Sequence, residues 1–241
     1  MKQYEAVMEV MKNRGGYATL GELYKEVFKL EGVKWTTNTP FASIRRIVQD
    51  KRFFFRIRPG LWALKSHTDE VSRLFDLKNK KKGREEEFGH SYYQGLLIEI
   101  GNLKNYHTFV PNQDKNKKFL DKPLKDLTSI DQIFTFSYTY VVDKASTVDV
   151  SWFNARKFPQ AFFEVEHSTE FKNSLVKFVE LQDFNTEFRI VADRLRERQY
   201  RTCIELNAFK AIAHRVKFLS YDVLAELHTK TVELSLIEKE F

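Results

Sequence analysis

Three acidic residues lie in apolar segments, where a carboxylate is costly to bury without a partner. Glu164 and Glu166 alternate with apolar residues in the segment AFFEVE, so in a β-strand both glutamates point to the same face. Asp149 lies in a second apolar segment, STVDVSW. An exposed polar strand face is the plainer interpretation of an acid-x-acid pattern, but the apolar surroundings favour a functional cluster.

Spacing brings the third acid to the other two. If residues 154–159 connect the two segments as a hairpin centred between Arg156 and Lys157, Asp149 lies directly opposite Glu164, because both are equally far from the midpoint. The Cβ atoms of opposed residues are about 4.5–5.5 Å apart. Carboxylates this close need a cation, and oxygen ligands suit Mg²⁺, with Mn²⁺ as a substitute, better than zinc. Such an ion polarises a phosphodiester and lowers the pKa of an attacking water, so the pattern predicts phosphodiester hydrolysis.

The composition fits a cytoplasmic protein with a polyanionic partner. The formal net charge of +7 favours nucleic acid, which gains affinity through counterion release. The one cysteine, Cys203, excludes an internal disulfide and a multi-cysteine zinc site. The sequence has no apolar run of membrane-spanning length, and its start lacks a secretory signal. Motifs of nucleotide hydrolases, esterases, zinc proteases and dinucleotide enzymes are absent.

The first 66 residues predict three helices and a hairpin. Apolar spacing predicts a helix that Gly15-Gly16 ends and a second helix over about 20–30. Thr39 and Pro40 then supply an N-cap and a first-turn proline for a third helix. Two short β-like runs flank the turn formers Pro59 and Gly60. This order is typical of a winged helix.

The segments GGYATLGELYKEV, TPFASIRRIVQ and RIRPGLWAL resemble the winged-helix domain of the HARE-HTH type. The resemblance implies double-stranded DNA as a partner, with the third helix directed to the major groove. A solvated face of a protein-interaction module is the alternative. The expected DNA contacts from this module are Thr37, Asn38, Ser43, Arg45, Arg46 and Arg58.

Residues 67–88 differ from what precedes and follows them. The stretch KNKKKGREEE joins a basic block, a glycine and an acidic block, which is typical of a solvated linker. Beyond it, apolar periodicity predicts an α/β domain over residues 89–241, with a central mixed sheet flanked by helices. The expected elements are helices over about 88–103, 171–181 and 193–200, strands over 132–142, 147–153, 160–166 and 188–192, and a segment 216–219 leading into a last helix near Tyr221.

The segment VDVSWFNARKFPQAFFEVEHST, residues 148–169, resembles the catalytic hairpin of the PD-(D/E)XK nuclease superfamily. The resemblance implies that Asp149 is the first metal-binding acid and Glu164 the second. Glu166 stands where a lysine is usual, which matches a Glu-x-Glu subset of restriction endonucleases. The lysine's role in activating water then falls to Glu166 or to a metal-bound water. Lys172 is a further source of positive charge, but a solvated lysine at the mouth of a helix is the favoured interpretation.

Further site residues are expected on either side of the acids. The run HSYYQGLLIEIG resembles the first core helix of the superfamily, where an acidic or amide residue approaches the metal, and Gln94 is our candidate, with His90 and Glu99 behind it. His167 would point away from the acids along the strand, in a structural role. Thr169 begins the next helix as a cap, with a DNA phosphate contact as the alternative.

The sequence therefore predicts a DNA endonuclease of the type II restriction kind, acting as a homodimer because cutting both strands takes two active sites. A cognate DNA methyltransferase is an expected partner. Two alternatives remain open. One is a DNA-binding regulator with an inactive nuclease-like core, and the other is a nuclease that depends on DNA modification or shape.

Overall fold

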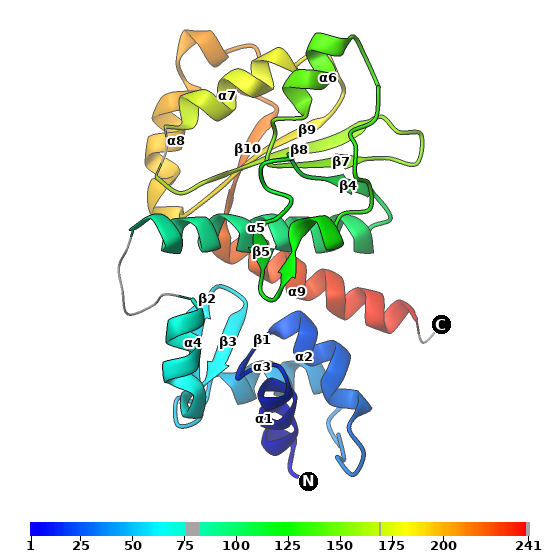
Figure 1. The fold of residues 1–241 in the computed structure, drawn as a ribbon, viewed down its shortest axis with the longest axis vertical. Coiled ribbons are helices and arrows are strands. Elements are labelled where there is room, and N and C mark those ends of the chain that lie inside the picture. Colours follow the sequence, from blue (N-terminus) through cyan, green and yellow to red (C-terminus); the bar gives the residue numbers. More distant parts are fainter. Residues whose placement is uncertain (76–81, 169, 240–241) are drawn as a thin grey trace. The chain divides into compact units, whose positions relative to one another are not determined.

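A computed structural model describes residues 1–75, 82–168 and 170–239, with the backbone alone over 82–88. The chain divides into two compact units (Figure 1). The first contains Met1–Glu85 and Ala225–Phe241, and the second contains Glu86–Leu224. Among the described residues, no helix is both long and apolar enough to cross a membrane.

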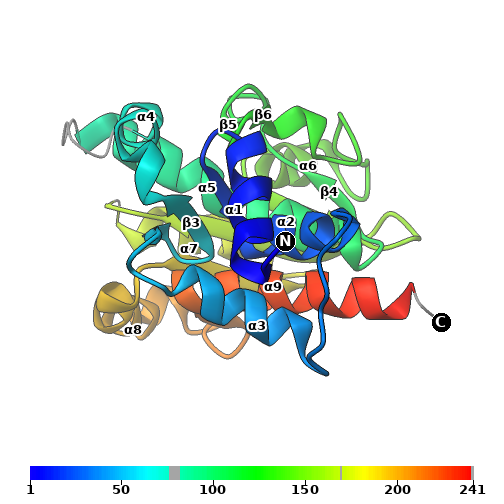
Figure 2. The ribbon, with the colours of Figure 1, turned by 90° about the horizontal axis from the view of Figure 1, so that it is seen from below.

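The first unit opens with the three predicted helices, α1 (Gln3–Asn13), α2 (Leu20–Glu26) and α3 (Pro40–Val48) (Figure 2). Gly15 and Gly16 end α1 with φ angles of 81° and 90°, which only glycine adopts without strain. Pro40 takes the first position of α3 as predicted. Thr39 is the N-cap residue as predicted, although its side chain makes no capping hydrogen bond.

The predicted hairpin is present and gains a third strand. β2 (Phe54–Arg58) pairs antiparallel with β3 (Leu61–Leu64), and β1 (Tyr17–Thr19) pairs with the other edge of β3. The short helix α4 (Thr68–Leu74) follows, inside the segment expected to be a linker, and the buried side chains of Val71 and Phe75 anchor it. The 3₁₀ turns of this unit are Val27–Lys29 and Lys65–His67.

The second unit is built on a central mixed sheet, as predicted, and this sheet has five strands, of which β4 was not predicted. Its order is β10-β9-β8-β7-β4, with antiparallel pairing from β4 to β8 and parallel pairing from β8 to β10. The strands are β4 (His107–Phe109), β7 (Val150–Phe153), β8 (Pro159–Glu166), β9 (Glu187–Ala192) and β10 (Val216–Ser220). A two-stranded ribbon, β5 (Lys118–Phe119) with β6 (Lys122–Pro123), lies outside this sheet.

Helices cover both faces of the sheet (Figure 1). On one side lies α5 (Lys82–Leu103), and on the other lie α6 (Thr139–Ala145), α7 (Phe171–Glu180) and α8 (Glu197–Ile204). The 3₁₀ turns are Leu124–Asp126, Arg194–Arg196 and Asn207–Phe209, and α9 (Tyr221–Glu238) follows β10. Phe162 and Phe188 of the sheet pack with Phe171 and Phe178 of α7, forming the centre of a buried core.

One predicted strand is wrong. Residues 132–142, rich in Phe, Tyr, Thr and Val, form an irregular segment followed by α6. Val141 and Ala145, four residues apart, pack into the core, while Tyr138 and Tyr140 are 76% and 71% exposed. The buried residues of this segment are spaced as in a helix and do not alternate as in a strand. Its strand-favouring residues did not produce a strand, because strand propensity reflects packing on the surface of a sheet, which this segment does not join.

Candidate active site

The hairpin β7–β8 has the predicted register. Val150 pairs with Phe163 and Trp152 with Ala161, an alignment that continues to Asp149 opposite Glu164. The backbone N–H of Val165 donates to Asp149 Oδ2 at 2.7 Å, and the backbone N–H of Asp149 lies 3.4 Å from Glu164 Oε1. The two carboxylates that we predicted to be neighbours are held together by the ends of their own strands.

Glu166 joins this pair through a serine. Ser174 Oγ on α7 lies 2.9 Å from Glu164 Oε2 and also contacts Glu166 Oε1. Asp149, Glu164 and Glu166 are 8%, 3% and 5% exposed, so all three carboxylates are buried at one end of the sheet. A cavity of about 360 Å³ opens onto them.

A lysine that the sequence analysis missed balances part of this charge. Lys177 Nζ lies 2.8 and 2.9 Å from the two carboxylate oxygens of Glu164 and 2.9 Å from the carbonyl oxygen of Thr147. Lys172, for which a solvated position was the favoured interpretation, is 58% exposed and lies 3.9 Å from Glu170. The sequence could have indicated Lys177, because residues 174 and 177 are three apart and share a face of the helix α7.

The electrostatics of the cluster favour a bound cation. Burial and the charge of Asp149 raise the pKa of Glu164 well above its usual value, although Lys177 and Ser174 oppose the shift. Burial alone would raise the pKa of Asp149, but His90 and the N–H of Val165 lower it overall. Three buried carboxylates line the cavity together with two lysines, Lys117 and Lys177, so the carboxylates outnumber the ammonium groups and a divalent ion would neutralise the remaining negative charge. The donor set therefore fits a divalent metal.

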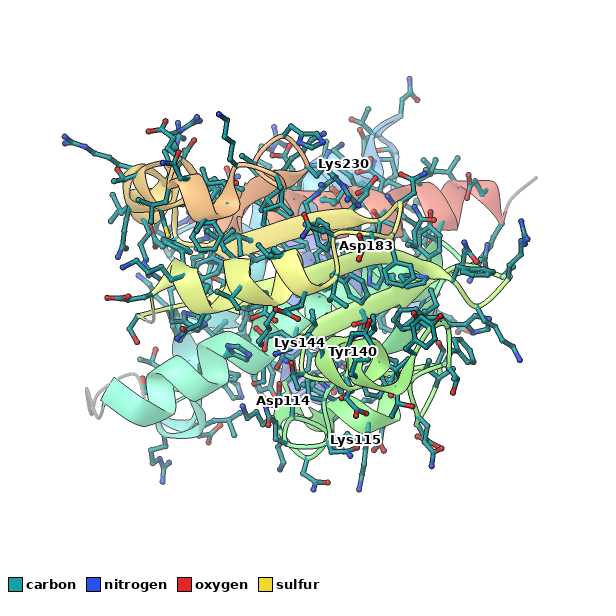
Figure 3. The ribbon with its side chains drawn as sticks, turned by 90° about the horizontal axis from the view of Figure 1, so that it is seen from above. Asp114, Lys115, Tyr140, Lys144, Asp183 and Lys230 are labelled. Carbon is teal, nitrogen blue, oxygen red and sulfur yellow. The ribbon has the colours of Figure 1, made fainter. Side chains whose placement is uncertain are left out.

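Gln94 lies at the site, as expected, and contacts a second residue that was missed. Its side-chain Nε2 donates to Asp114 Oδ2 at 2.7 Å and to the carbonyl oxygen of Asp149 at 3.0 Å. Asp114 is 1% exposed and follows β4 in a loop, close to α5 (Figure 3). A lone aspartate in an irregular loop gives no sequence pattern that distinguishes it.

Histidines complete the lining of the cavity. His90 Nε2 on α5 lies 3.5 Å from Asp149 Oδ2, and the carboxylates of Asp149 and Asp114 raise the pKa of His90 even though burial acts to lower it. His167 lies within hydrogen-bond distance of the Tyr221 hydroxyl, at 2.8 Å, and also lines the cavity, which the prediction of an outward-facing structural residue did not anticipate. Glu99 does not line the cavity.

In the first unit, the residues expected to contact DNA differ in their exposure and in their bonds to other residues. Arg45 Nη1 lies 2.8 Å from the Tyr24 hydroxyl and 2.9 Å from Glu233 Oε2 on α9, which lies next to α3 (Figure 2). Arg46 is exposed, and no residue in the described ranges pairs with its guanidinium. Asn38 is also exposed.

The remaining expected contacts are less open. Thr37 Oγ1 accepts a hydrogen bond from the backbone N–H of Thr39 at 3.1 Å, and Ser43 Oγ donates to the Thr39 carbonyl oxygen at 3.4 Å. Arg58 at the end of β2 is partly exposed. Thr169 lies outside the described residues.

Comparison with known proteins covers both units. Residues 2–67 match the HARE-HTH model, whose description names a restriction endonuclease HTH domain. The Type II restriction enzyme NmeDI of Neisseria meningitidis serogroup C is 27% identical over 161 residues, which are 62% of this chain and 45% of that protein. The match thus spans less than half of that relative's length. No solved structure matches.

A second family model covers most of the chain. Residues 72–241 match the model described as the Type II restriction enzyme NmeDI C-terminal domain, and this range contains every residue of the carboxylate cluster. The chain therefore belongs to the family of the Type II restriction enzyme NmeDI C-terminal domain, with a HARE-HTH region before it.

Proposed function

We propose that this chain is a divalent-metal-dependent DNA endonuclease of the PD-(D/E)XK kind, with its active site in the β7–β8 hairpin. One observation carries the proposal. Asp149, directly before β7, and Glu164 on β8 are buried beside a cavity lined mainly by charged and polar residues, and Lys177 lies against Glu164. Membership of a restriction-enzyme family supports a nuclease, because this cluster lies within the matched range.

Each residue of the cluster has a role in this proposal. Asp149 and Glu164 hold Mg²⁺, for which Mn²⁺ can substitute, and a bound ion there supplies charge for the scissile phosphate and lowers the pKa of water. Gln94 positions the backbone of Asp149 by its hydrogen bond to that carbonyl oxygen. Lys177 supplies positive charge near the attacking water, whereas the sequence predicted that Glu166 or a metal-bound water would take over the activation of that water. Glu166 shares Ser174 with Glu164 and helps to fix its orientation.

The HARE-HTH region supplies DNA recognition in this proposal. We infer that residues 1–66 bind double-stranded DNA and that residues 89–241 form the nuclease domain. Residues 67–88 link the two. Exposed Arg46 and Asn38 at α3 are the best-placed DNA contacts, since Arg45 is held in an ion pair. A homodimer would bring two active sites to one duplex, and a methyltransferase of matching specificity would protect host DNA.

The test is digestion of long, diverse DNA by the purified chain with Mg²⁺ or with a chelator, followed by sequencing of the ends. We expect Mg²⁺-dependent fragments with common ends. Asp149→Ala should abolish cleavage and preserve DNA binding, while Asp183→Asn, at an exposed aspartate of the same unit, should cut normally. Cleavage by Asp149→Ala at the normal rate would overturn the assignment of the site.

Unmodified DNA that stays intact would call for two further experiments. Cleavage of modified DNA alone would establish a modification-dependent nuclease. Metal-independent binding without cleavage of either substrate would instead establish a DNA-binding regulator and reject the nuclease proposal.

A further inference from the structure

The residues around His90 carry an inference that deepens the proposed function and rests on it. We propose that His90, Asp114 and Asp149 form a second cation position beside the Asp149–Glu164 pair, and that this position prefers Mn²⁺ to Mg²⁺. Asp149 would serve both positions. The three residues come from α5, from the loop after β4 and from the start of the β7–β8 hairpin, so the tertiary fold alone brings them together.

The ligand atoms lie close to the spacings that one ion can bridge. An imidazole nitrogen of His90 and one carboxylate oxygen from each aspartate lie within 4.8 Å of one another. Donors bonded to the same ion at about 2.1 Å are about 3.0 Å apart when adjacent in an octahedron and about 4.2 Å apart when opposite. The separation of 3.5 Å between His90 Nε2 and Asp149 Oδ2 is long for a hydrogen bond but falls between these two values.

A buried amide gives an independent indication of a missing ligand. The Gln94 side chain is fully buried, and its Nε2 holds Asp114 Oδ2 at 2.7 Å. The other atom of that amide, Oε1, is buried in the same place, and no donor in the described part of the chain reaches it. An unsatisfied buried oxygen is costly, and water carried by a cation at Asp114 would supply the donor.

The charges around the position also favour a cation. Lys117 Nζ lies 2.7 Å from Asp114 Oδ1, and among the described residues no other ammonium contacts this carboxylate. The Lys117 side chain is 30% exposed, so it can move into solvent when a cation binds. Asp114 and Asp149 are both buried, at 1% and 8% exposed. Two buried carboxylates facing an imidazole make a site of mixed oxygen and nitrogen donors.

That donor mixture sets the preference among metals. Mg²⁺ takes oxygen ligands almost exclusively, whereas Mn²⁺ also accepts imidazole and binds more tightly in mixed sites. The Asp149–Glu164 position, which offers oxygen donors, would not make this distinction. We therefore expect the two positions to separate in their response to the two metals.

The first experiment examines Mn²⁺ bound to the full chain by electron spin-echo envelope modulation. Nitrogen modulation from a coordinated imidazole is expected in the unaltered protein and in His214→Gln, whose histidine is exposed and outside the cavity. The modulation should disappear in His90→Gln. Its absence from the unaltered protein at saturating Mn²⁺ would overturn the proposal without reference to any variant.

A calorimetric titration with Mn²⁺ tests the same position by affinity. Both His90→Gln and Asp114→Asn should weaken binding at least about tenfold. Circular dichroism is the control that each variant is folded. Unchanged Mn²⁺ affinity in both folded variants would overturn the proposal.

The outcomes also separate this inference from the nuclease proposal. If the chain cuts DNA with Mg²⁺ but shows no nitrogen modulation, the second position is wrong and the nuclease stands. If the modulation is present and depends on His90 while no DNA is cut, the cation position stands and the nuclease proposal fails.

Discussion

The ammonium of Lys177 on α7 lies 2.8 and 2.9 Å from both carboxylate oxygens of Glu164 on β8. The same Nζ donates to the carbonyl oxygen of Thr147, just before β7, so one lysine contacts both segments that carry the buried acids Asp149 and Glu164. Burial acts to lower the pKa of Lys177, but Glu164 and Asp149 raise it, which keeps the side chain charged. Positive charge thus reaches this site from a helix, while the next position on the same face of β8 holds the carboxylate Glu166.

We predict that Lys177→Met lowers the single-turnover rate of DNA cleavage by about 10²-fold or more and leaves DNA affinity in chelator unchanged. The variant loses the ammonium beside Glu164, and the pKa of Glu164, already raised by burial, rises further. Lys172→Met is the matched control, because Lys172 is an exposed lysine of the same helix. Cleavage by Lys177→Met at the normal rate would show that Lys177 has only a structural role.

We predict that Gln94→Leu lowers the free energy of unfolding by about 1–3 kcal/mol. The leucine keeps the approximate volume but removes the donor that Asp114 and the Asp149 carbonyl share, and buried acceptors without donors are costly. Urea denaturation measures the change. Gln113→Leu, at an exposed glutamine beside Asp114, should differ little from the unaltered protein. Equal stability of the two variants would contradict this account of Gln94.

The hairpin and its register could be predicted because they are local. Alternating apolar residues fix which face Glu164 and Glu166 share, and the short connection fixes the partner of each residue. The turn itself is specified nearby, since Asn154 Oδ1 accepts hydrogen bonds from the backbone N–H groups of Arg156 and Phe158. The segment 132–142 misled the same reasoning because its aromatic residues favour strands in general, whereas two of its tyrosines remain exposed.

The rest of the site depends on how helices pack against the sheet. Lys177 lies 13 residues beyond Glu164, and only the placement of α7 against the sheet turns it toward that carboxylate. Asp114 depends on an irregular loop, and its partner Gln94 is 20 residues away. Neither the apolar period nor a short motif determines these contacts, so the sequence predicted the acids and not their partners.

We predict that Arg46→Ala weakens DNA binding across all sequences and reduces the slope of log affinity against log salt by about one. The reason is that Arg46 is exposed at α3 and free to reach phosphate. Arg45→Ala should change that slope less, because its guanidinium already pairs with Glu233 and Tyr24. Filter binding over a salt series measures both slopes. The opposite ranking would show that the ion pair opens when DNA binds.

We predict that the stability contributed by Glu233 depends on pH in the acidic range. Burial acts to raise the pKa of Glu233, but the hydrogen bonds and charges of Arg45 and Lys230 lower it overall, from an ordinary value of 4.5. A carboxylate with a lowered folded-state pKa contributes stability that is fully present above the unfolded pKa and is lost as pH falls through the folded pKa. The groups facing it are Arg45, Lys230 and the Tyr24 hydroxyl. Burial acts to lower the pKa of Arg45, but Glu233 and Tyr24 raise it overall, and burial raises the pKa of Tyr24 to about 12, so neither group changes its charge across this range.

The measurement is thermal denaturation of the unaltered protein and Glu233→Gln from pH 7 to pH 3. The difference in melting temperature should be constant near neutral pH and should shrink as pH falls below about 4.5. Glu226→Gln, at an exposed glutamate of the same helix, is the matched control and should melt close to the unaltered protein at pH 7. If the difference in melting temperature between Glu233→Gln and the unaltered protein stays constant down to pH 3, the loss of stability does not come from the ion pair of Glu233 with Arg45.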